Sequence, residues 1–179
     1  MRYLFTSLRL GFRNWIESDV PKMIAISSDE DVMEFFPAVA TPGQTTVFIE
    51  KMQALYKDKG FCYFAVEEVE SKTLIGFVGL NSIEYERPFE TTVDIGWRLS
   101  KEFWGKGYAS EGARACLKYG FETLQIPQII ATAPVVNVRS LAVMKKVGMV
   151  KGGEFMHPRL KDFPHLNPCS FFLIDKAGS

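Results

Sequence analysis

One stretch, residues 93–122, constrains the fold more than any other part of the chain, and it reads VDIGWRLSKEFWGKGYASEGARACLKYGFE. Apolar residues alternate with polar or small ones over its first part, which predicts a strand at residues 93–99. Ala113, Leu117 and Phe121 share one face of its last part, which predicts a helix. A glycine-rich turn joins the two, so the chain must pack a sheet against a helix that starts at glycine.

The glycine turn, residues 104–109, predicts an anion site. The first backbone N–H groups of a helix have no partner within the helix, and they lie at the positive end of its dipole. A phosphate is the natural ligand for such a position. The turn is not a P-loop, because Gly107 follows Lys106 where a hydroxyl residue is required, and Ser110 occupies the third glycine position of the dinucleotide fingerprint. A surface turn without a ligand is the alternative interpretation.

Two sequence blocks together resemble the acetyl-CoA site of the GNAT acetyltransferases. The first is the stretch just described, which matches the family's loop pattern Q/R-x-x-G-x-G/A at Gly107 and Ala109 but has Trp104 at the leading position. The second matches the family's N-x-x-[SA]-x-x-x-x-x-K-x-G-[FM] segment, at Asn137, Ser140, Lys146, Gly148 and Met149. The branch that the chain resembles most is the RimJ/RimL type, which includes ribosomal-protein N-terminal acetyltransferases.

This resemblance implies a fold and an activity. The fold is α+β, with a central, mostly antiparallel mixed sheet that splays between its fourth and fifth strands and is flanked by helices, in a single domain spanning residues 1–179. The implied activity is an N-acetyltransferase that uses acetyl-CoA as cosubstrate. The acetyl group would pass to a primary amine, on a protein N-terminus or a small molecule, by direct attack in a ternary complex.

Two other functions stay open. Many family members place a tyrosine acid where this chain has Met144, and its loss favours a non-catalytic acyl-CoA-binding or sensor domain. A nucleotide-binding module would instead prefer ATP to CoA.

The resemblance places cofactor contacts at the end of the strand, in the glycine turn and at the start of a later helix. These residues are Trp97, Arg98, Leu99, Trp104, Gly105, Lys106, Gly107, Tyr108, Ala109, Ser110, Asn137 and Ser140.

Acetyl transfer needs a deprotonated amine, a polarised thioester and a proton for the leaving thiolate. Asp94 is the first candidate base, because it lies close to where several family members carry a catalytic glutamate; a structural carboxylate is the alternative. Glu84 and Glu34 are weaker candidates. Backbone N–H groups near residues 95–97 would polarise the thioester. Ser140 is the candidate acid, against the alternative that it caps a helix.

Aromatic and polar residues outside the two blocks are candidates for the acceptor pocket, each against the alternative of an ordinary core position. The predicted pocket residues are Phe35, Glu84, Trp97 and His157, and the further aromatic candidates are Trp15, Phe36 and Phe155.

Charge and cysteine content limit the partners. The 21 basic and 21 acidic residues balance, so no overall field indicates nucleic acid. No apolar run has the length of a membrane span, and no signal-peptide core is evident at the start. The three cysteines have neither disulfide nor zinc spacing, so we expect no metal and a cytoplasmic location. A monomer or a homodimer fits the family.

Hydrophobic periodicity and turn residues predict the remaining elements. The expected strands are residues 8–14, 61–67, 74–80, 93–99, 129–133, 150–155 and 170–175, and the expected helices start near residues 20, 29, 46, 108 and 140.

Overall fold

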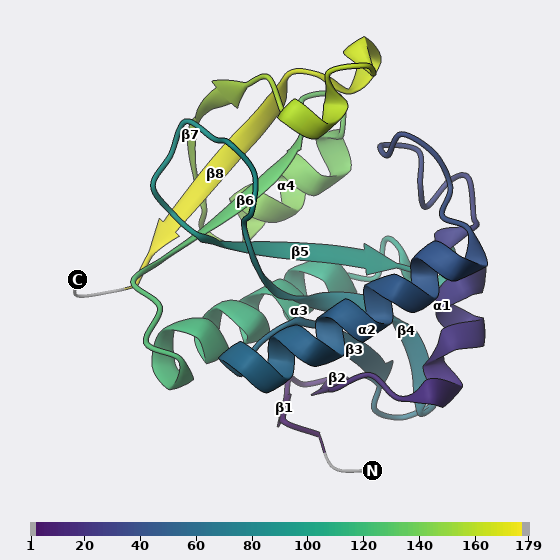
Figure 1. The fold of residues 1–179 in the computed structure, drawn as a ribbon. Helices are drawn as coiled ribbons and strands as arrows, with labels where there is room; N and C mark the ends of the chain where they lie inside the picture. Colours follow the sequence, from purple (N-terminus) through teal and green to yellow (C-terminus); the bar gives the residue numbers. More distant parts are fainter. Residues whose placement is uncertain (1–2, 177–179) are drawn as a thin grey trace.

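An eight-stranded mixed sheet runs through residues 3–176, the part of the chain that the computed structural model describes (Figure 1). All neighbouring strands are antiparallel except β5 and β6, so the predicted fold class is confirmed. In spatial order the strands are β1 (Phe5–Thr6), β2 (Leu10–Arg13), β3 (Tyr63–Glu68), β4 (Thr73–Ser82), β5 (Val93–Leu99), β6 (Gln128–Pro134), β8 (Cys169–Asp175) and β7 (Val150–Phe155).

The sheet opens between β5 and β6. These parallel strands are paired only where Asp94 faces Ile130, whereas β5 is paired with β4 along its whole length. Figure 1 shows β5 and β6 diverging from that point. The splay predicted between the fourth and fifth strands is therefore present, and one edge of β5 from Ile95 onward lies beside the opening.

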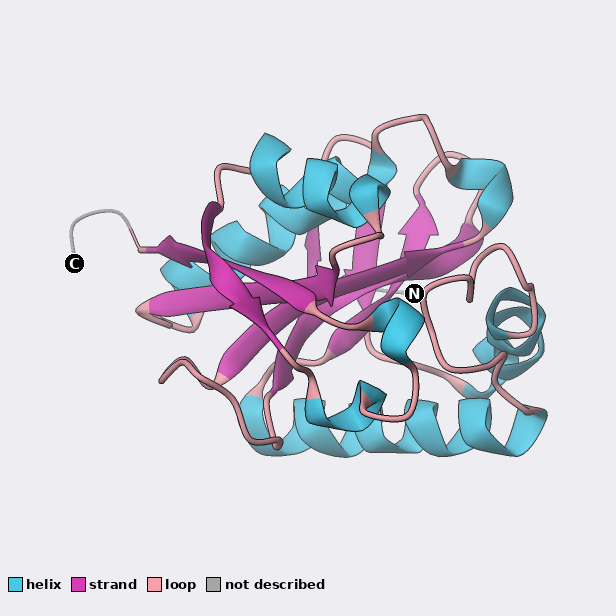
Figure 2. Cartoon of the chain, turned by 90° about the horizontal axis from the view of Figure 1, so that it is seen from above, coloured by secondary structure: helices cyan, strands magenta, loops and turns pink. Residues whose placement is uncertain are grey.

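Helices cover both faces of the sheet, with α1 and α2 on one side and α3 and α4 on the other (Figure 2). Thr41 begins α2 with a capping box to Gln44, and Gly60 ends it in the left-handed conformation. The helical segments are η1 (Glu17–Asp19), α1 (Val20–Ser27), α2 (Pro42–Lys59), η2 (Lys101–Phe103), α3 (Tyr108–Lys118), η3 (Tyr119–Thr123, a π turn), α4 (Val138–Lys146), η4 (Pro158–Leu160) and η5 (Pro164–Leu166).

Two sequence predictions for the elements need correction. Residues 29–36 form turns rather than a helix. The Asp29 carboxylate accepts the N–H groups of Asp31 and Val32 as a helix N-cap would. Only the Met33 N–H then bonds four residues back, and Pro37 follows. The helix expected from residue 46 begins at Pro42, where proline fits the first turn. The short strand β1 was not predicted, because two residues carry no periodicity.

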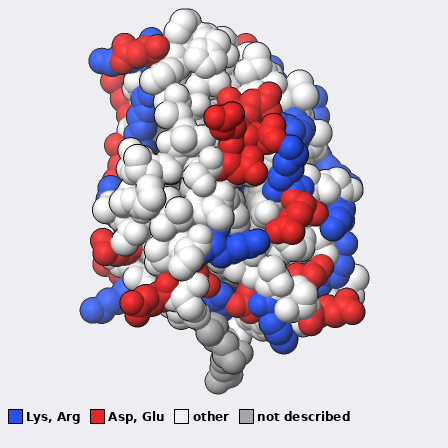
Figure 3. Space-filling view, turned by 90° about the vertical axis from the view of Figure 1, so that its right-hand side faces the viewer, with Lys and Arg blue, Asp and Glu red and all other residues white. Residues whose placement is uncertain are grey.

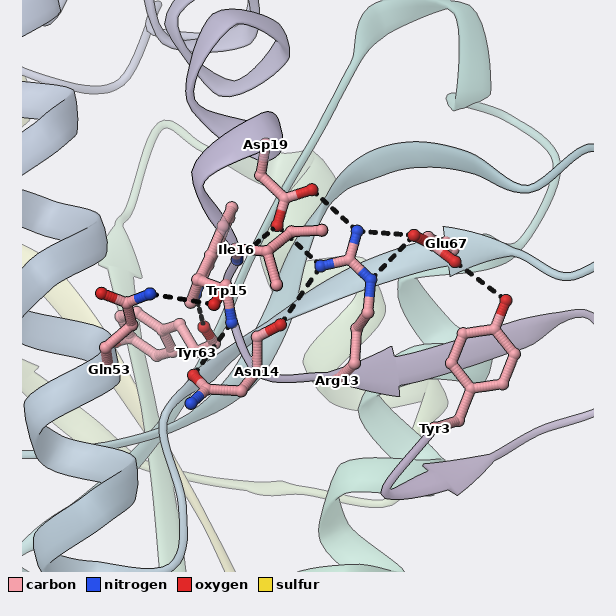
Figure 4. A network of polar contacts seen from close by, with 9 residues as sticks. All are labelled: Tyr3, Arg13, Asn14, Trp15, Ile16, Asp19, Gln53, Tyr63 and Glu67. Atoms are coloured by element: carbon pink, nitrogen blue, oxygen red, sulfur yellow. Dashed lines mark hydrogen bonds and ion pairs between the residues drawn. The ribbon is translucent and has the colours of Figure 1, made fainter. Parts of the chain in front are cut away.

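A buried ionic network joins the first strands to α1 and α2 (Figure 4). The guanidinium of Arg13 binds Asp19 at 2.6 and 2.7 Å and Glu67 at 2.5 and 2.7 Å. Next to it, the Trp15 indole donates to the Tyr63 carbonyl at 2.7 Å, and Gln53 on α2 donates to the Trp15 carbonyl at 2.9 Å. This network fixes the start of β3, where Tyr63 faces the candidate site.

Charged side chains of both signs are interspersed on the face seen in Figure 3, in keeping with the balanced composition. Within residues 3–176, the helices are all too short or too polar to span a membrane.

Candidate active site

A cavity of about 1370 Å³ lies at the opening between β5 and β6. The glycine turn, the start of α3, the start of α4 and the loop after α1 all contribute to its walls. Most residues that the sequence analysis singled out meet here: Phe35, Glu84, Asp94, Trp97, Arg98, Leu99, Trp104, Gly105, Gly107, Tyr108, Ala109, Ser110, Asn137, Ser140 and His157. Residues far apart in the sequence therefore form one continuous surface.

The glycine turn presents backbone donors to this cavity. Gly105 and Gly107 have φ angles of 72° and 81°, a left-handed conformation that glycine adopts without strain. Gly107 is the N-cap of α3, and it has no side chain that could hydrogen-bond the first N–H groups of that helix. The first backbone N–H groups of α3 and the positive end of its dipole therefore lie together at the cavity wall.

Lys106 does not line this cavity but lines a shallow groove of about 610 Å³ beside the turn, and its Nζ lies 5.3 Å from the Phe103 ring centroid. Four further cations line this groove, and only Lys146 is one of the positions that match the family's two sequence patterns: Arg9, Arg114, Lys118 and Lys146. Its acid, Glu111, accepts hydrogen bonds from Ser7 and from the Arg9 backbone and guanidinium, each at 2.7 Å. The groove therefore has a strong positive excess next to the glycine turn. Only the folded arrangement of α3, α4 and the turn before β2 brings these cations together.

Asp94 lies at the point where β5 and β6 separate, and its carboxylate is held by Tyr63. The phenol donates to both carboxylate oxygens, at distances of 3.1 and 2.9 Å. Burial raises the pKa of Asp94 to about 7, while the hydrogen bond from Tyr63 opposes that rise. Burial and the neighbouring Asp94 charge raise the pKa of Tyr63 well above its ordinary value, so this phenol stays protonated. A carboxylate with a pKa near neutrality is suited to accept a proton.

The edge of β5 that faces the opening supplies further donors. Beyond Asp94 this strand has no pairing with β6, and alternate backbone N–H groups of an antiparallel strand point away from its partner β4. Residues 95–99 border the cavity through this edge. The arrangement can stabilise a carbonyl oxygen on which negative charge develops.

Comparison with known proteins identifies the family. Residues 9–150 match the family model described as an acetyltransferase (GNAT) domain. The chain belongs to the GNAT acetyltransferases. It is 34% identical over 151 residues to YnaD of Bacillus subtilis, described as an uncharacterized N-acetyltransferase, and the match covers 84% of each chain.

Solved GNAT structures share the fold. A GNAT-family acetyltransferase from Bacillus anthracis superposes with a TM-score of 0.77 at 31% identity, covering 96% of this chain and 97% of that one. A ribosomal-protein-S5-alanine acetyltransferase from Vibrio fischeri gives a TM-score of 0.76 at 20% identity, with 97% of each chain covered. The protein is thus an N-acetyltransferase, and the second likeness shows the fold alone.

In this GNAT acetyltransferase α4 begins differently from the prediction. The helix starts at Val138, and its N-cap is Asn137, whose side-chain oxygen accepts the Ser140 N–H at 3.0 Å. Ser140 is therefore the third residue of the helix and does not cap it. Its side chain borders the cavity, as does Met144, which is only 1% exposed.

The outer wall of the cavity comes from the loop between α1 and α2. Phe35 on this loop and Trp104 in the glycine turn lie on the Arg139 guanidinium, with ring centroids 5.5 and 4.6 Å from its carbon. Glu34 forms an ion pair with Arg139, and Asp31 forms one with Lys101. These contacts hold the loop against both cofactor-side blocks.

The acceptor side of the cavity was only partly predicted. Trp15 and Phe155 are core residues that do not line it. Five further wall residues were not predicted from the sequence: Tyr63, Phe77, Phe48, Asn81 and Tyr85. A signal for Tyr63 exists at Gly96, since a Cβ there would lie 3.0 Å from the Tyr63 ring, and glycine within a strand often marks such a close approach.

Within residues 3–176 of the GNAT enzyme, no group of three or more His, Cys, Asp or Glu side chains is arranged to hold a metal ion. Its three cysteines are buried, and burial raises the pKa of Cys169 to about 11 and that of Cys116 well above its ordinary value. Their thiols are poor nucleophiles in this state.

Proposed function

We propose that the protein transfers the acetyl group of acetyl-CoA to a primary amine by direct attack in a ternary complex, as one domain spanning residues 1–179. The observation that carries this proposal is the single cavity that joins the glycine turn, the free edge of β5 and the Asp94 carboxylate. Substrate binding and proton transfer can take place there without an enzyme-bound acetyl intermediate. The buried, high-pKa thiols provide no competing nucleophile.

The cofactor residues divide by the part of acetyl-CoA that they contact. In this proposal the first N–H groups of α3, after Gly107, bind the pyrophosphate, and the positive groove around Lys106 binds the phosphate at the nucleotide end. The β5 edge at Trp97–Leu99 (residues 97–99) and Asn137 border the pantetheine arm. The fit is supported by the absence of a Cβ at Gly107, which lets a phosphate approach the backbone.

The proposed chemistry uses two side chains. Asp94, with its pKa near 7, accepts the proton of the attacking ammonium, directly or through water. The N–H groups on the free edge of β5 stabilise the oxyanion. Ser140 donates a proton to the departing thiolate, since Met144 cannot do so, and regains one from the nitrogen of the tetrahedral intermediate.

The acceptor is the amine of a protein N-terminus or of a small molecule, bound between Phe35, Glu84, Trp97 and His157. A RimJ/RimL-type assignment is supported by the two sequence blocks.

The deciding experiment measures thiol release from acetyl-CoA with a panel of amines and N-terminal peptides, alongside calorimetry with CoA and with ATP. Tight CoA binding with amine-dependent thiol release supports the proposal. CoA binding without thiol release for any amine would indicate an acyl-CoA sensor, and preference for ATP would indicate a nucleotide-binding module. Mass spectrometry of proteins incubated with the enzyme and acetyl-CoA then tests protein acceptors.

A further inference from the structure

The Arg98 side chain is a cation that borders the cavity without a carboxylate partner among residues 3–176. Its Nη1 donates to the hydroxyl of Ser27, at the end of α1, over 3.2 Å. Its Nε is buried and has no hydrogen-bond partner there. The ion pairs of the described chain do not include Arg98, although it lines the cavity.

A buried guanidinium without an anion is unfavourable, because its hydration is lost and little replaces it. Burial accordingly lowers the pKa of Arg98 to about 10, which still leaves the group charged at neutral pH. Two aromatic rings offset part of the cost: the guanidinium carbon lies 4.4 Å from the Phe36 centroid and 5.3 Å from that of Phe77. The hydrogen bond to Ser27 uses one of five N–H donors.

The position of Arg98 relates it to the reaction. Asp94, Gly96 and Arg98 lie two positions apart along β5 and therefore share one face of the sheet. Four residues along a strand correspond to about 13 Å between Cα atoms. Gly96 contributes no side chain between the two charged residues, and the Tyr63 ring lies there instead.

We infer that Arg98 binds a carboxylate of the acceptor, so that the acceptor is a primary amine carrying a carboxylate several bonds away. A carboxylate accepts two parallel hydrogen bonds from a guanidinium, which is the geometry that the unused donors offer. The aromatic rings of Phe48 and Phe77 also line the cavity and would contact the body of such a molecule. This inference deepens the proposed function and rests on it.

A different role for Arg98 makes a different prediction. As a cation at the C-terminal end of α1, it could only anchor Ser27 and the following loop. Its loss would then lower catalysis with every acceptor to the same extent.

The test uses pairs of acceptors that differ only in one group: 6-aminohexanoate and 6-aminohexanamide, β-alanine and β-alaninamide, and N-terminal peptides with Asp or Asn at the second position. For each pair, kcat/KM is measured with wild type, Arg98→Gln and Arg98→Lys. Comparing the carboxylate-to-carboxamide ratio between variants cancels the different reactivity of the two amines. The small molecules and the peptides separate the two sources of a carboxylate.

We expect Arg98→Gln to lower the ratio of kcat/KM for the carboxylate to kcat/KM for the carboxamide about 10- to 100-fold for at least one pair. Arg98→Lys should retain part of the wild-type preference for the carboxylate. Lys51→Gln is the matched control, because it removes an exposed cation from the same cavity and should leave the ratio unchanged. Equal loss on both members of every pair, or a wild-type ratio retained by Arg98→Gln, overturns the inference.

Failure of the proposed function has a separate signature. If wild type acetylates none of these amines, the proposed activity is in question, and binding decides the role of Arg98. Calorimetry with CoA-loaded wild type and Arg98→Gln then compares each carboxylate with its carboxamide. Binding of 6-aminohexanoate that is weakened by the substitution supports the inference, and equal binding of carboxylate and carboxamide to wild type rejects it.

Discussion

The phenol of Tyr63 donates to both oxygens of Asp94, at 3.1 and 2.9 Å, where β5 leaves β6. This donor stabilises the charged carboxylate, whereas burial stabilises the protonated acid. The two effects leave the pKa of Asp94 at about 7, with burial the larger. Tyr63 is in turn fixed by the Trp15 indole, which donates to its carbonyl (Figure 4). The pKa of the candidate base, Asp94 on β5, therefore depends on Tyr63 on β3 and on the Trp15 contact that holds Tyr63 in place.

The first prediction concerns the pH dependence of catalysis. If Asp94 is the base, kcat/KM rises with pH through about 7 as its carboxylate loses the proton. Tyr63→Phe removes the donor that favours the charged form, so the acidic limb should move up by about one pH unit. Tyr119→Phe is the control, because that phenol donates to the Gly60 carbonyl at 3.0 Å. If the acidic limb of the pH profile of kcat/KM stays in place in Tyr63→Phe, Asp94 is not the base.

Direct replacement of the base gives a second prediction. Asp94→Asn should lower kcat about 10²- to 10⁴-fold at pH 7, where the amine is mostly protonated. Activity should partly return at high pH, where the amine is already free. A full rate across the pH range would make Asp94 a structural residue.

The same substitution should stabilise the fold, which is the third prediction. The pKa of Asp94 is higher in the folded state than in the unfolded state, so folding binds a proton between about pH 4 and 7. Stability of the wild type is therefore lost as pH rises through this window. Asp94→Asn should match the wild type near pH 4 and exceed it by about 1–4 kcal/mol at pH 8, since partial solvent access reduces the effect. Urea unfolding at both pH values measures this difference. Equal stability of the wild type and Asp94→Asn at pH 8 would show that folding does not raise the pKa of Asp94.

The fourth prediction tests the glycine turn. Gly107→Val places a β-branched residue at a φ of 81°, so we expect a cost of about 1–2 kcal/mol and loss of CoA binding with the fold retained. Gly43→Ala is the control, because a Cβ at Gly43 meets no atom within 4 Å and the residue lies in α2. Calorimetry should find normal CoA affinity in the control. Unchanged affinity in a folded Gly107→Val variant would remove the turn from the site.

The fold was predictable where the evidence was local. The alternation in β5 and the turn between β3 and β4 each lie within one short window, and both predictions are confirmed. The helix predicted at residues 29–36 stops after one turn, because Pro37 follows and only the Met33 N–H bonds four residues back. Tyr63 and Phe77 could not be assigned to the site from local pattern, since their place depends on the register of three strands. Arg98 was assigned by its place in a motif, but its side chain lies against Ser27.

The last prediction separates Ser140 from Asn137, which lie at the same helix start. Asn137 caps α4 by accepting the Ser140 N–H at 3.0 Å, so Asn137→Ala should cost about 1 kcal/mol of stability. The Ser140 hydroxyl has no part in that cap, so Ser140→Ala should change the melting temperature little. If Ser140 protonates the thiolate, the kcat of Ser140→Ala should be about 10²- to 10⁴-fold lower than that of the wild type. Ser140→Thr keeps a hydroxyl and should restore part of the rate. A Ser140→Ala enzyme with near-normal turnover would leave protonation of the thiolate to water.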